Sequence, residues 1–505
     1  MPTVARGALP LLLLRVDATR SPGGAGIGHA MRCLNLAREW IGRGGAVQVL
    51  TTGLPDVVHE RYRAVGVEVL APVTGLLPGG RADALMVVDR VRRTAPAWVV
   101  ADGYHFGEAF QVPVGESARL LVVDDHALTG AGGAAMVLDQ NVDADAAEYA
   151  DRAAGCRLLL GNRFAIVDPA FAARGRRDRS GPVARVLIAL GGGPRTAWLA
   201  RVDGAAERLA ERGFEVRVVG SAPDGIGKRA SWREFSDDVA SEMGEADLCL
   251  AAAGSTTWEI CCAGLPALLA SVADNQVPVA RAIERAGAAI DVGWWEDLTE
   301  TGIVEAVQRL ARDASRRATM AAQAMALVDG WGAARVVDAL WPRVALRPAA
   351  SGDARLLWEW ANDPVTRRAS FSTAPILWSD HLSWLGAHLA APTSLLLVGS
   401  DDAGEPVGQI RFERAGTVAE VSVNLAPDRR GQGYGATLVR VGAAHAFGHW
   451  AGLREVVGVV KVDNTLSMRA FQAAGFERIE TAVAGPGGEP VTRWRLRQED
   501  LDVRR

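Results

Sequence analysis

Cysteine is scarce in this chain, lysine is almost absent, and no apolar run approaches membrane-spanning length. The chain has five cysteines, at Cys33, Cys156, Cys249, Cys261 and Cys262. None forms a Cys-x-x-Cys pair or has histidines at metal-ligand spacing, so we expect no disulfide framework, no metal site and a reducing compartment. The apolar segment at residues 9–14 is too short to cross a bilayer, and Arg15 and Asp17 follow it, so we expect no signal peptide.

The charge balance argues against another class of partner. With 55 basic and 59 acidic residues the net charge is −4, which gives no basis for non-specific nucleic-acid binding. Hydrophobic residues make up 49% of the chain and charged residues 23%, as in ordinary globular proteins, and 505 residues exceed one typical domain. We therefore expect a cytoplasmic protein of three domains without a membrane partner. The sequence leaves its oligomeric state open.

A glycine-containing loop near the start of the chain organises the first domain. Residues 11–16 predict a buried strand and residues 30–41 an amphipathic helix, with Gly26-Ile27-Gly28-His29 between them. Backbone N–H groups and the helix dipole at such a turn suit an anionic or phosphorylated ligand. His29 is the nearby side chain that exchanges a proton near neutral pH, so we predict it to be a catalytic base.

Residues 1–170 alternate short apolar strands with helical patterns, which predicts an α/β lobe with a parallel sheet. Ligands bind such sheets at the carboxyl ends of the strands. Polar residues follow four of the predicted strands, at Asp17, at Asp102 to His105, at Asp124 to His126, and at Gln140 and Asn141. Together they predict an active-site rim. Taken singly, a carboxylate here could be a helix cap, a histidine could be structural, and Tyr104 could simply pack.

Residues 171–343 predict a second lobe of the same kind. The charged, glycine-containing segment at residues 174–179 has no apolar period and predicts the crossing between the lobes. The strand at residues 186–190 then leads into a run of three glycines, at Gly191, Gly192 and Gly193. This run is a weak phosphate signal, because a tight turn explains it equally well.

A second turn in this lobe is a stronger phosphate signal. Gly254-Ser255-Thr256 follows an apolar strand and opens a helix, and amides at a helix start bind diphosphate. Glu259, one turn later, can accept hydrogen bonds from both hydroxyls of a ribose. The alternative is a capping box between Thr256 and Glu259. Asn275 and Gln276 lie in the next loop and could add amide contacts.

Two such lobes, with glycine-rich turns facing a shared cleft, describe the GT-B fold. The second lobe resembles the nucleotide-binding half of the peptidoglycan N-acetylglucosaminyltransferases in its Gly-Ser-x-x-x-Glu, Ala-Gly-Leu-Pro-Ala and Asn-Gln runs. The first lobe resembles the UDP-2,4-diacetamido-2,4,6-trideoxy-β-L-altropyranose hydrolases of the pseudaminic acid pathway. That resemblance is carried by Arg15, Asp17, Gly26, Gly28, His29, Arg32, Leu34, Leu36, Ala37, Asp102, Gly103, Tyr104, Asp124, Asp125, Asn141 and the run Gly161-x-x-Phe164-Ala165-Ile166.

The hydrolase resemblance covers roughly residues 11–340 and implies a division of roles. UDP would bind the second lobe, and the sugar would face the first, where His29 deprotonates a water that attacks the anomeric carbon with inversion. The implied sugar contacts are Arg15, Asp17, Gly28, Arg32, Asp102, Tyr104 and Asn141. The implied UDP contacts are Gly191, Gly192, Gly193, Gly254, Ser255, Thr256, Glu259, Asn275 and Gln276.

Residues 344–505 change to a helix followed by antiparallel strands, which predicts an α+β domain. The run Arg429-Arg430-Gly431-Gln432-Gly433-Tyr434-Gly435 joins a strand to a helix and resembles the acetyl-CoA loop of the GNAT acetyltransferases. Asn464 and the later Gly475-Phe476 resemble the end of the GNAT core. The resemblance implies acetyl-CoA as cosubstrate, contacted by Leu425, Arg430, Gly431, Gln432, Gly433, Tyr434, Gly435 and Asn464.

Two further positions bear on acetyl transfer. Phe471 stands where many GNAT members have a tyrosine that acts as general acid, and we expect it to pack in the core. His381 belongs to a segment that resembles the GNAT subgroup acetylating UDP-4-amino-sugars, and a structural role suits it at least as well as a role as base.

The two resemblances imply consecutive reactions on one UDP-amino-sugar. The favoured hypothesis is a bifunctional enzyme that N-acetylates a UDP-4-amino-sugar and hydrolyses the diacetamido product to UDP and free sugar. Two other functions stay open. One is a GT-B glycosyltransferase that passes a sugar from UDP to an acceptor, and the other is a non-catalytic nucleotide-sugar-binding module with a degenerate GNAT domain.

Overall fold

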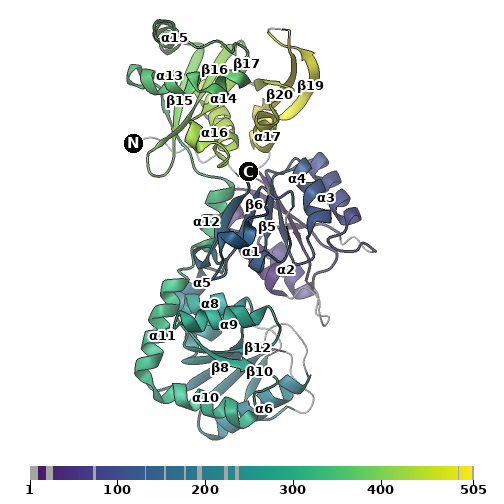
Figure 1. The fold of residues 1–505 in the computed structure, drawn as a ribbon, viewed down its shortest axis with the longest axis vertical. Coiled ribbons are helices and arrows are strands. Elements are labelled where there is room, and N and C mark those ends of the chain that lie inside the picture. The colour runs from purple at the N-terminus through teal and green to yellow at the C-terminus, as the bar shows by residue number, and fades with distance from the viewer. Residues whose placement is uncertain are drawn as a thin grey trace.

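The computed structural model describes residues 9–18, 27–71, 75–130, 132–152, 155–175, 178–189, 196–220, 226–233, 238–486 and 488–502. The chain forms three α/β parts, and the amino-terminal lobe lies between the second lobe and the carboxy-terminal domain (Figure 1). The predicted fold class is confirmed, because the first two sheets are parallel and the third is mixed. Within the described ranges, no helix combines the length and apolar character that a bilayer crossing needs.

The first lobe is a seven-stranded parallel sheet in the order β3-β2-β1-β4-β5-β6-β7. Its strands are β1 (Leu11–Val16), β2 (Ala46–Leu50), β3 (Glu68–Val69), β4 (Trp98–Asp102), β5 (Leu120–Val123), β6 (Met136–Asp139) and β7 (Arg157–Leu160). Its helices are α1 (Ile27–Gly42), α2 (Asp56–Ala64), α3 (Arg81–Thr94) and α4 (Glu108–Ser117). The central strands are buried on both faces and therefore appear in the sequence as continuous apolar runs. The sequence did not predict β7, a short edge strand that is only partly buried.

The second lobe is a six-stranded parallel sheet in the order β10-β9-β8-β11-β12-β13. Its strands are β8 (Arg185–Ala189), β9 (Glu215–Val219), β10 (Ser231–Arg233), β11 (Leu248–Ala252), β12 (Ala267–Ser271) and β13 (Ile290–Trp294). Its helices are α5 (Ala170–Gly175), α6 (Thr196–Glu211), α7 (Val239–Glu245), α8 (Thr256–Ala263), α9 (Gln276–Arg285), α10 (Glu300–Arg312) and α11 (Ala314–Leu327).

The segment predicted to cross between the lobes, residues 174–179, ends in a buried arginine. Arg179 is buried and donates hydrogen bonds to the backbone carbonyls of Met243, Ala246, Ala263 and Gly264. Its guanidinium therefore stabilises the ends of α7 and α8 inside the second lobe. Composition alone did not reveal this role, because the carbonyl acceptors lie more than 60 residues away along the chain.

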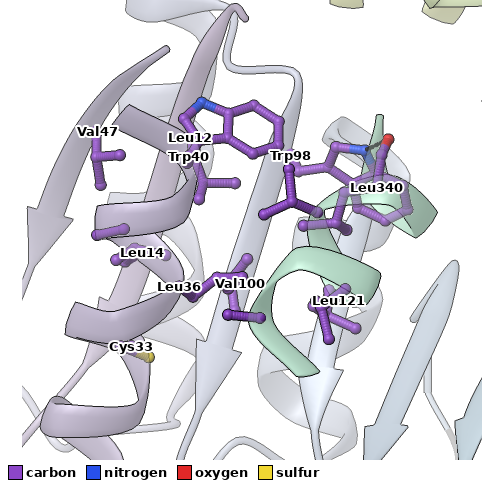
Figure 2. Packing of buried hydrophobic residues seen from close by; sticks show 14 of the residues in the cluster. Leu12, Leu14, Cys33, Leu36, Trp40, Val47, Trp98, Val100, Leu121 and Leu340 are labelled. Atoms are coloured by element: carbon purple, nitrogen blue, oxygen red, sulfur yellow. Dashed lines mark hydrogen bonds between the residues drawn. The ribbon is translucent and has the colours of Figure 1, made fainter. Parts of the chain in front are cut away.

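Helix α12 (Gly332–Leu340) ends the second lobe in sequence but packs on the first lobe in space. Ala333, Val336 and Leu340 belong to the same buried cluster as the first-lobe strands. Trp98 Nε1 donates a hydrogen bond of 2.8 Å to the Leu340 carbonyl, as the dashed line in Figure 2 shows. The predicted division at residue 343 therefore does not follow the packing, since the chain returns to the first lobe before that point.

The carboxy-terminal domain has a seven-stranded sheet in the order β14-β15-β16-β17-β18-β20-β19. Its strands are β14 (Ala345–Pro348), β15 (Ser394–Ser400), β16 (Pro406–Ala415), β17 (Val418–Leu425), β18 (Glu455–Lys461), β19 (Glu477–Ala484) and β20 (Pro490–Arg497). Its helices are α13 (Ala354–Asn362), α14 (Pro364–Ala369), α15 (Trp378–Ala390), α16 (Tyr434–His449), α17 (Thr465–Ala473) and α18 (Gln498–Asp502). The antiparallel strands predicted for this domain are confirmed in β15, β16 and β17, which pair in that order.

Candidate functional site

His29 lies in the first turn of α1, next to the carboxyl end of β4. Its Nδ1 is 2.7 Å from Asp102 Oδ1, and its side chain is 11% exposed. Arg32 Nη2 also lies 3.2 Å from Nδ1, but it donates to Asp102 Oδ1 at 2.7 Å. A carboxylate accepts hydrogen bonds only, so in the neutral ring the contact with Asp102 assigns the proton to Nδ1 and leaves a lone pair on Nε2. The ring therefore has the tautomer that a general base needs.

Asp102 is fully buried and binds three neighbours on α1. Arg32 donates to both of its oxygens, from Nε to Oδ2 at 2.9 Å and from Nη2 to Oδ1 at 2.7 Å, and Cys33 Sγ lies 3.5 Å from Oδ2. Burial alone would raise the pKa of Asp102, but the charge of Arg32 and the hydrogen bonds from His29 and Arg32 hold it well below its usual range. Because its oxygens are occupied, Asp102 is arranged to orient His29, whereas the sequence predicted a sugar contact.

A second layer of polar side chains surrounds this pair. Arg32 Nη1 is 3.3 Å from Asp125 Oδ1, and the Tyr104 hydroxyl donates to Asp125 Oδ2 at 3.3 Å. Asn141 Nδ2 reaches Asp125 Oδ1 at 3.4 Å and Asp139 Oδ1 at 2.7 Å. Asp125 thus links three predicted sugar contacts; the sequence placed it on the active-site rim but did not name it as a sugar contact. The feature that could have identified Asp125 as a site residue is its position directly after β5, which lies beside β4 in the sheet.

Arg15 and Asp17 lie in a buried ion cluster at the end of β1. Arg15 donates to Asp83 through Nε at 2.9 Å and Nη2 at 2.8 Å, and its Nη1 lies 2.6 Å from Asp17. Burial would raise the pKa of Asp17, but hydrogen bonds from His105 and Arg15 lower it far more. Arg15 is completely buried. Asp17 also accepts from the Thr52 amide and Asp83 from the Gly79 amide, so the cluster supports the loops after β2 and before α3.

The second lobe meets this site at the start of α8. A Cβ atom on Gly28 would collide with Ser255 Oγ, so the first turns of α1 and α8 approach closely. Asn275 Nδ2 donates a hydrogen bond of 3.0 Å to the Tyr104 hydroxyl and thereby bridges the lobes. The predicted sugar and UDP residues thus come together from sequence separations of up to 227 residues, counting from Gly28 to Ser255.

The turn at Gly254-Ser255-Thr256 opens α8 without a side-chain cap, so backbone N–H groups there can bind an anionic ligand. No side chain caps the first turn of α8, so the predicted capping box between Thr256 and Glu259 is not formed. Gln276 lies beside Gly254, and its Oε1 accepts from the Val272 amide at 3.0 Å. The other predicted phosphate contacts, Gly191, Gly192 and Gly193, lie outside the described residues.

Glu259 has an unusual electrostatic environment. Burial, with a smaller contribution from the charge of Asp168, raises its pKa to about 7, and Arg61 opposes this shift. A carboxyl group with such a pKa is easily converted to a carboxylate when a ligand donates hydrogen bonds to it. Sequence reasoning missed Asp168 and Arg61, since no local motif connects either residue to Glu259.

The predicted acetyl-CoA loop lies between β17 and α16. Gly431 and Gly433 have φ values of +75° and +93°, a backbone conformation that favours glycine, and no side chain caps the start of α16. Strands β17 and β18 pair only from Val418 to Val421. Beyond these residues the two strands separate, which leaves backbone groups free for an extended ligand that ends at the loop.

The side chains around this loop have varied roles. Arg430 Nη2 lies 2.6 Å from Asp363 Oδ1 and 2.8 Å from Thr366 Oγ1, so it is bound to α14 and its preceding residue. Gln432 donates to the Asp428 carbonyl, and Asn464 caps α17 by accepting from the Ser467 amide. The remaining predicted contacts, Leu425, Tyr434 and Gly435, are packed at the base of the loop.

Phe471 and His381 have the structural roles expected for them. Phe471 is 3% exposed and packs edge-on against Phe476, with ring centroids 5.0 Å apart. His381 is buried, and its Nε2 is 2.9 Å from the Ala354 carbonyl. Burial lowers the pKa of His381, which keeps the ring neutral and makes a charged role unfavourable.

The described residues bring one group of metal-ligand types together, His126, Asp139 and Glu148. Asp139 Oδ2 accepts from the Tyr149 hydroxyl at 2.9 Å and from the His126 amide at 3.0 Å. These bonds give Asp139 a structural role. The expectation of a protein without a metal stays a prediction.

Comparison with known families gives two matches. Residues 343–477 match the acetyltransferase (GNAT) domain, and residues 221–333 match the glycosyltransferase family 28 C-terminal domain. The chain therefore joins a second lobe of the glycosyltransferase-28 type to a GNAT domain.

Two curated relatives match parts of the chain. The spore coat polysaccharide biosynthesis protein SpsG of Bacillus subtilis is 28% identical over 196 residues, 36% of this chain and 58% of the relative. The UDP-N-acetylglucosamine--N-acetylmuramyl-(pentapeptide) pyrophosphoryl-undecaprenol N-acetylglucosamine transferase of Sorangium cellulosum is 36% identical over 168 residues, 31% of this chain and 41% of the relative. The chain thus spans about half the length of these relatives.

Among solved structures, spermidine N-acetyltransferase from Vibrio cholerae in complex with CoA and spermine is similar to part of the chain. It is 19% identical, with a TM-score of 0.29, and the match covers 31% of this chain and 97% of that structure.

Proposed function

We propose that the two lobes hydrolyse a UDP-2,4-diacetamido-2,4,6-trideoxyhexose, with His29 as general base. The observation that carries this proposal is the His29–Asp102 pair, which lies at the junction of the lobes beside Ser255 and Asn275. A base in the correct tautomer, next to uncapped helix amides, suits attack by water on a nucleotide sugar.

The proposed reaction breaks one bond and forms one bond at the anomeric carbon. His29 Nε2 takes a proton from water while the water oxygen bonds to that carbon from the face opposite UDP. The carbon–oxygen bond to UDP breaks, and its electron pair leaves with the diphosphate. Amides at the start of α8 stabilise the charge that develops there. The products are UDP and a free sugar of inverted configuration.

We further propose that the GNAT domain N-acetylates the 4-amino group of the precursor UDP-sugar with acetyl-CoA. The uncapped start of α16 and the separating strands β17 and β18 support this use of the domain. Acetyl transfer needs the amine aligned with the thioester and one proton removed. Phe471 cannot donate a proton, so the thiolate would be protonated by water or leave unprotonated.

Mass spectrometry of a panel of UDP-amino-sugars, incubated with and without acetyl-CoA, tests both proposals. We expect one acetyl group to be added only with acetyl-CoA, and equimolar UDP and free sugar to appear from the diacetamido substrate without an acceptor. Release of UDP only when an acceptor is added would favour a glycosyltransferase. Binding without release or acetylation would favour a non-catalytic module.

Glu259 predicts a pH dependence of nucleotide-sugar binding. Its pKa of about 7 means that the carboxylate forms as the pH rises through 7, and the carboxylate accepts hydrogen bonds from ribose hydroxyls better than the acid does. We expect the Kd of a UDP-sugar to fall about fivefold to tenfold between pH 6 and pH 8, by calorimetry. In a Glu259→Gln variant this dependence should disappear. A dependence that survives the substitution would show that another group controls binding.

A further inference from the structure

The base of the first lobe covers the start of α16. Ala436 and Ala473 of the GNAT domain belong to the same buried cluster as Trp98 and Leu340. A Cβ atom on Gly433, in the acetyl-CoA loop, would lie 3.1 Å from Pro342 Cδ and 3.4 Å from Arg119 Nη2. The predicted cosubstrate loop is therefore in contact with another domain.

Three arginines gather at this contact. Arg119 precedes β5, and its guanidinium lies over the Trp98 ring, with Cζ 4.0 Å from the ring centroid. Arg157 begins β7 and donates one long hydrogen bond, 3.4 Å, to the Ala339 carbonyl. Arg469 lies on α17, which Figure 1 shows at the boundary of the two domains. In the part of the chain that the structure describes, none of the three has a carboxylate within ion-pair distance.

Three positive charges at one contact repel one another unless an anion lies among them. Burial, together with the neighbouring charges of Arg157 and Arg469, lowers the pKa of Arg119 to about 10. Burial also lowers the pKa of Arg157, which the nearby Tyr434 opposes. Arg119 is partly buried, whereas Arg157 and Arg469 are exposed. The three like charges repel one another and remain open to solvent, so the cluster is suited to an anionic ligand that enters from solution.

The arginine within the loop does not fill this role. Arg430 is bound to Asp363 and Thr366, on α14 and just before it. The guanidinium that lies against Gly433 is therefore that of Arg119, from the neighbouring lobe.

We propose that the first lobe completes the acetyl-CoA site, and that Arg119 and Arg157, with Arg469, bind a phosphate group of the cosubstrate held at Gly431 to Gly435. The inference rests on the proposed use of acetyl-CoA. Both the diphosphate and the 3′-phosphate of CoA have the required chemistry. The site is thus shared between domains, with Arg119 and Arg157 from the first lobe and Arg469 from the GNAT domain.

Calorimetric titration of the full chain with CoA tests the inference. Charge-assisted hydrogen bonds are strong enough that Arg119→Gln and Arg157→Gln should each weaken binding about tenfold. Arg119→Lys keeps the charge and should bind several-fold more tightly than Arg119→Gln. Arg92→Gln, on the exposed side of α3, is the matched control and should bind as the wild type does.

A second titration with 3′-dephospho-CoA identifies the phosphate. If the arginines bind the 3′-phosphate, the wild type prefers CoA and the variants lose that preference; if they bind the diphosphate, both ligands weaken equally. Wild-type affinity for CoA in both glutamine variants would overturn the inference while leaving acetyl transfer intact. A wild-type chain that binds no CoA would overturn the proposed acetyl transfer, and this site with it.

Discussion

A His29→Gln variant should release UDP from the diacetamido substrate about 1,000-fold more slowly than the wild type, because general bases contribute roughly 10²–10⁴-fold to such steps. Glutamine keeps a polar side chain at the start of α1 but cannot take a proton from water. We expect the loss in kcat, with little change in KM, since the contacts to UDP lie on the other lobe. Steady-state assay of UDP with a coupled enzyme measures both constants.

The acetyl-transfer reaction serves as an internal control for this variant. His29 and the acetyl-CoA loop lie at opposite ends of the first-lobe sheet, so acetylation should continue at the wild-type rate. His59→Gln, on α2, is the matched substitution and should leave UDP release unchanged. Full UDP release by the His29 variant would contradict its role as base, and no UDP release by either the variant or the wild type would favour a non-catalytic lobe.

Much of the fold could be predicted from local patterns in the sequence. Continuous apolar runs mark strands that are buried on both faces, and the glycine turns at Gly254 and Gly433 mark the starts of helices. These features depend on neighbours in the chain. The sequence could therefore predict the three sheets, the helix that carries His29 and the loop that opens α16.

Features that depend on distant pairs could not be predicted in the same way. The partners His29 and Asp102 are 73 residues apart, so the sequence predicted both as site residues but assigned Asp102 to the sugar. Arg179 reads as a solvated charge until its carbonyl partners are known. The return of α12 to the first lobe likewise depends on packing against Trp98.

One strand connects the two candidate sites. Trp98, at the amino end of β4, contacts Arg119 near the acetyl-CoA loop, and Asp102, at the carboxyl end, holds His29. Five residues of strand span only about 13 Å between the first and last Cα atoms. A substitution that destabilises β4 would affect both reactions, so measuring both separates a chemical defect from a folding defect.

An Asp102→Asn variant should be nearly as impaired in UDP release as the His29 variant. Its acetylation rate should stay unchanged if the defect is chemical rather than a defect in folding. The asparagine amide can donate to His29 Nδ1, which moves the ring proton to Nε2 and removes the base. The equivalent change in a Ser-His-Asp triad lowers kcat by about 10⁴-fold, so we expect a loss of about 10³–10⁴-fold here. Rates measured from pH 6 to pH 10 provide the test.

The pH profile separates a tautomer effect from a purely structural one. If Asp102 acts by orienting His29, UDP release by the Asp102→Asn variant should become faster as the pH rises, because hydroxide replaces the missing base. Removing its charge also leaves the buried Arg32 with only the longer contact of 3.3 Å to Asp125, which should lower the free energy of unfolding by about 3 kcal/mol in a denaturant titration. Asp89→Asn, an exposed position on α3, is the matched control and should change neither quantity. A stable Asp102→Asn protein with wild-type UDP release would show that His29 needs no partner to act as base.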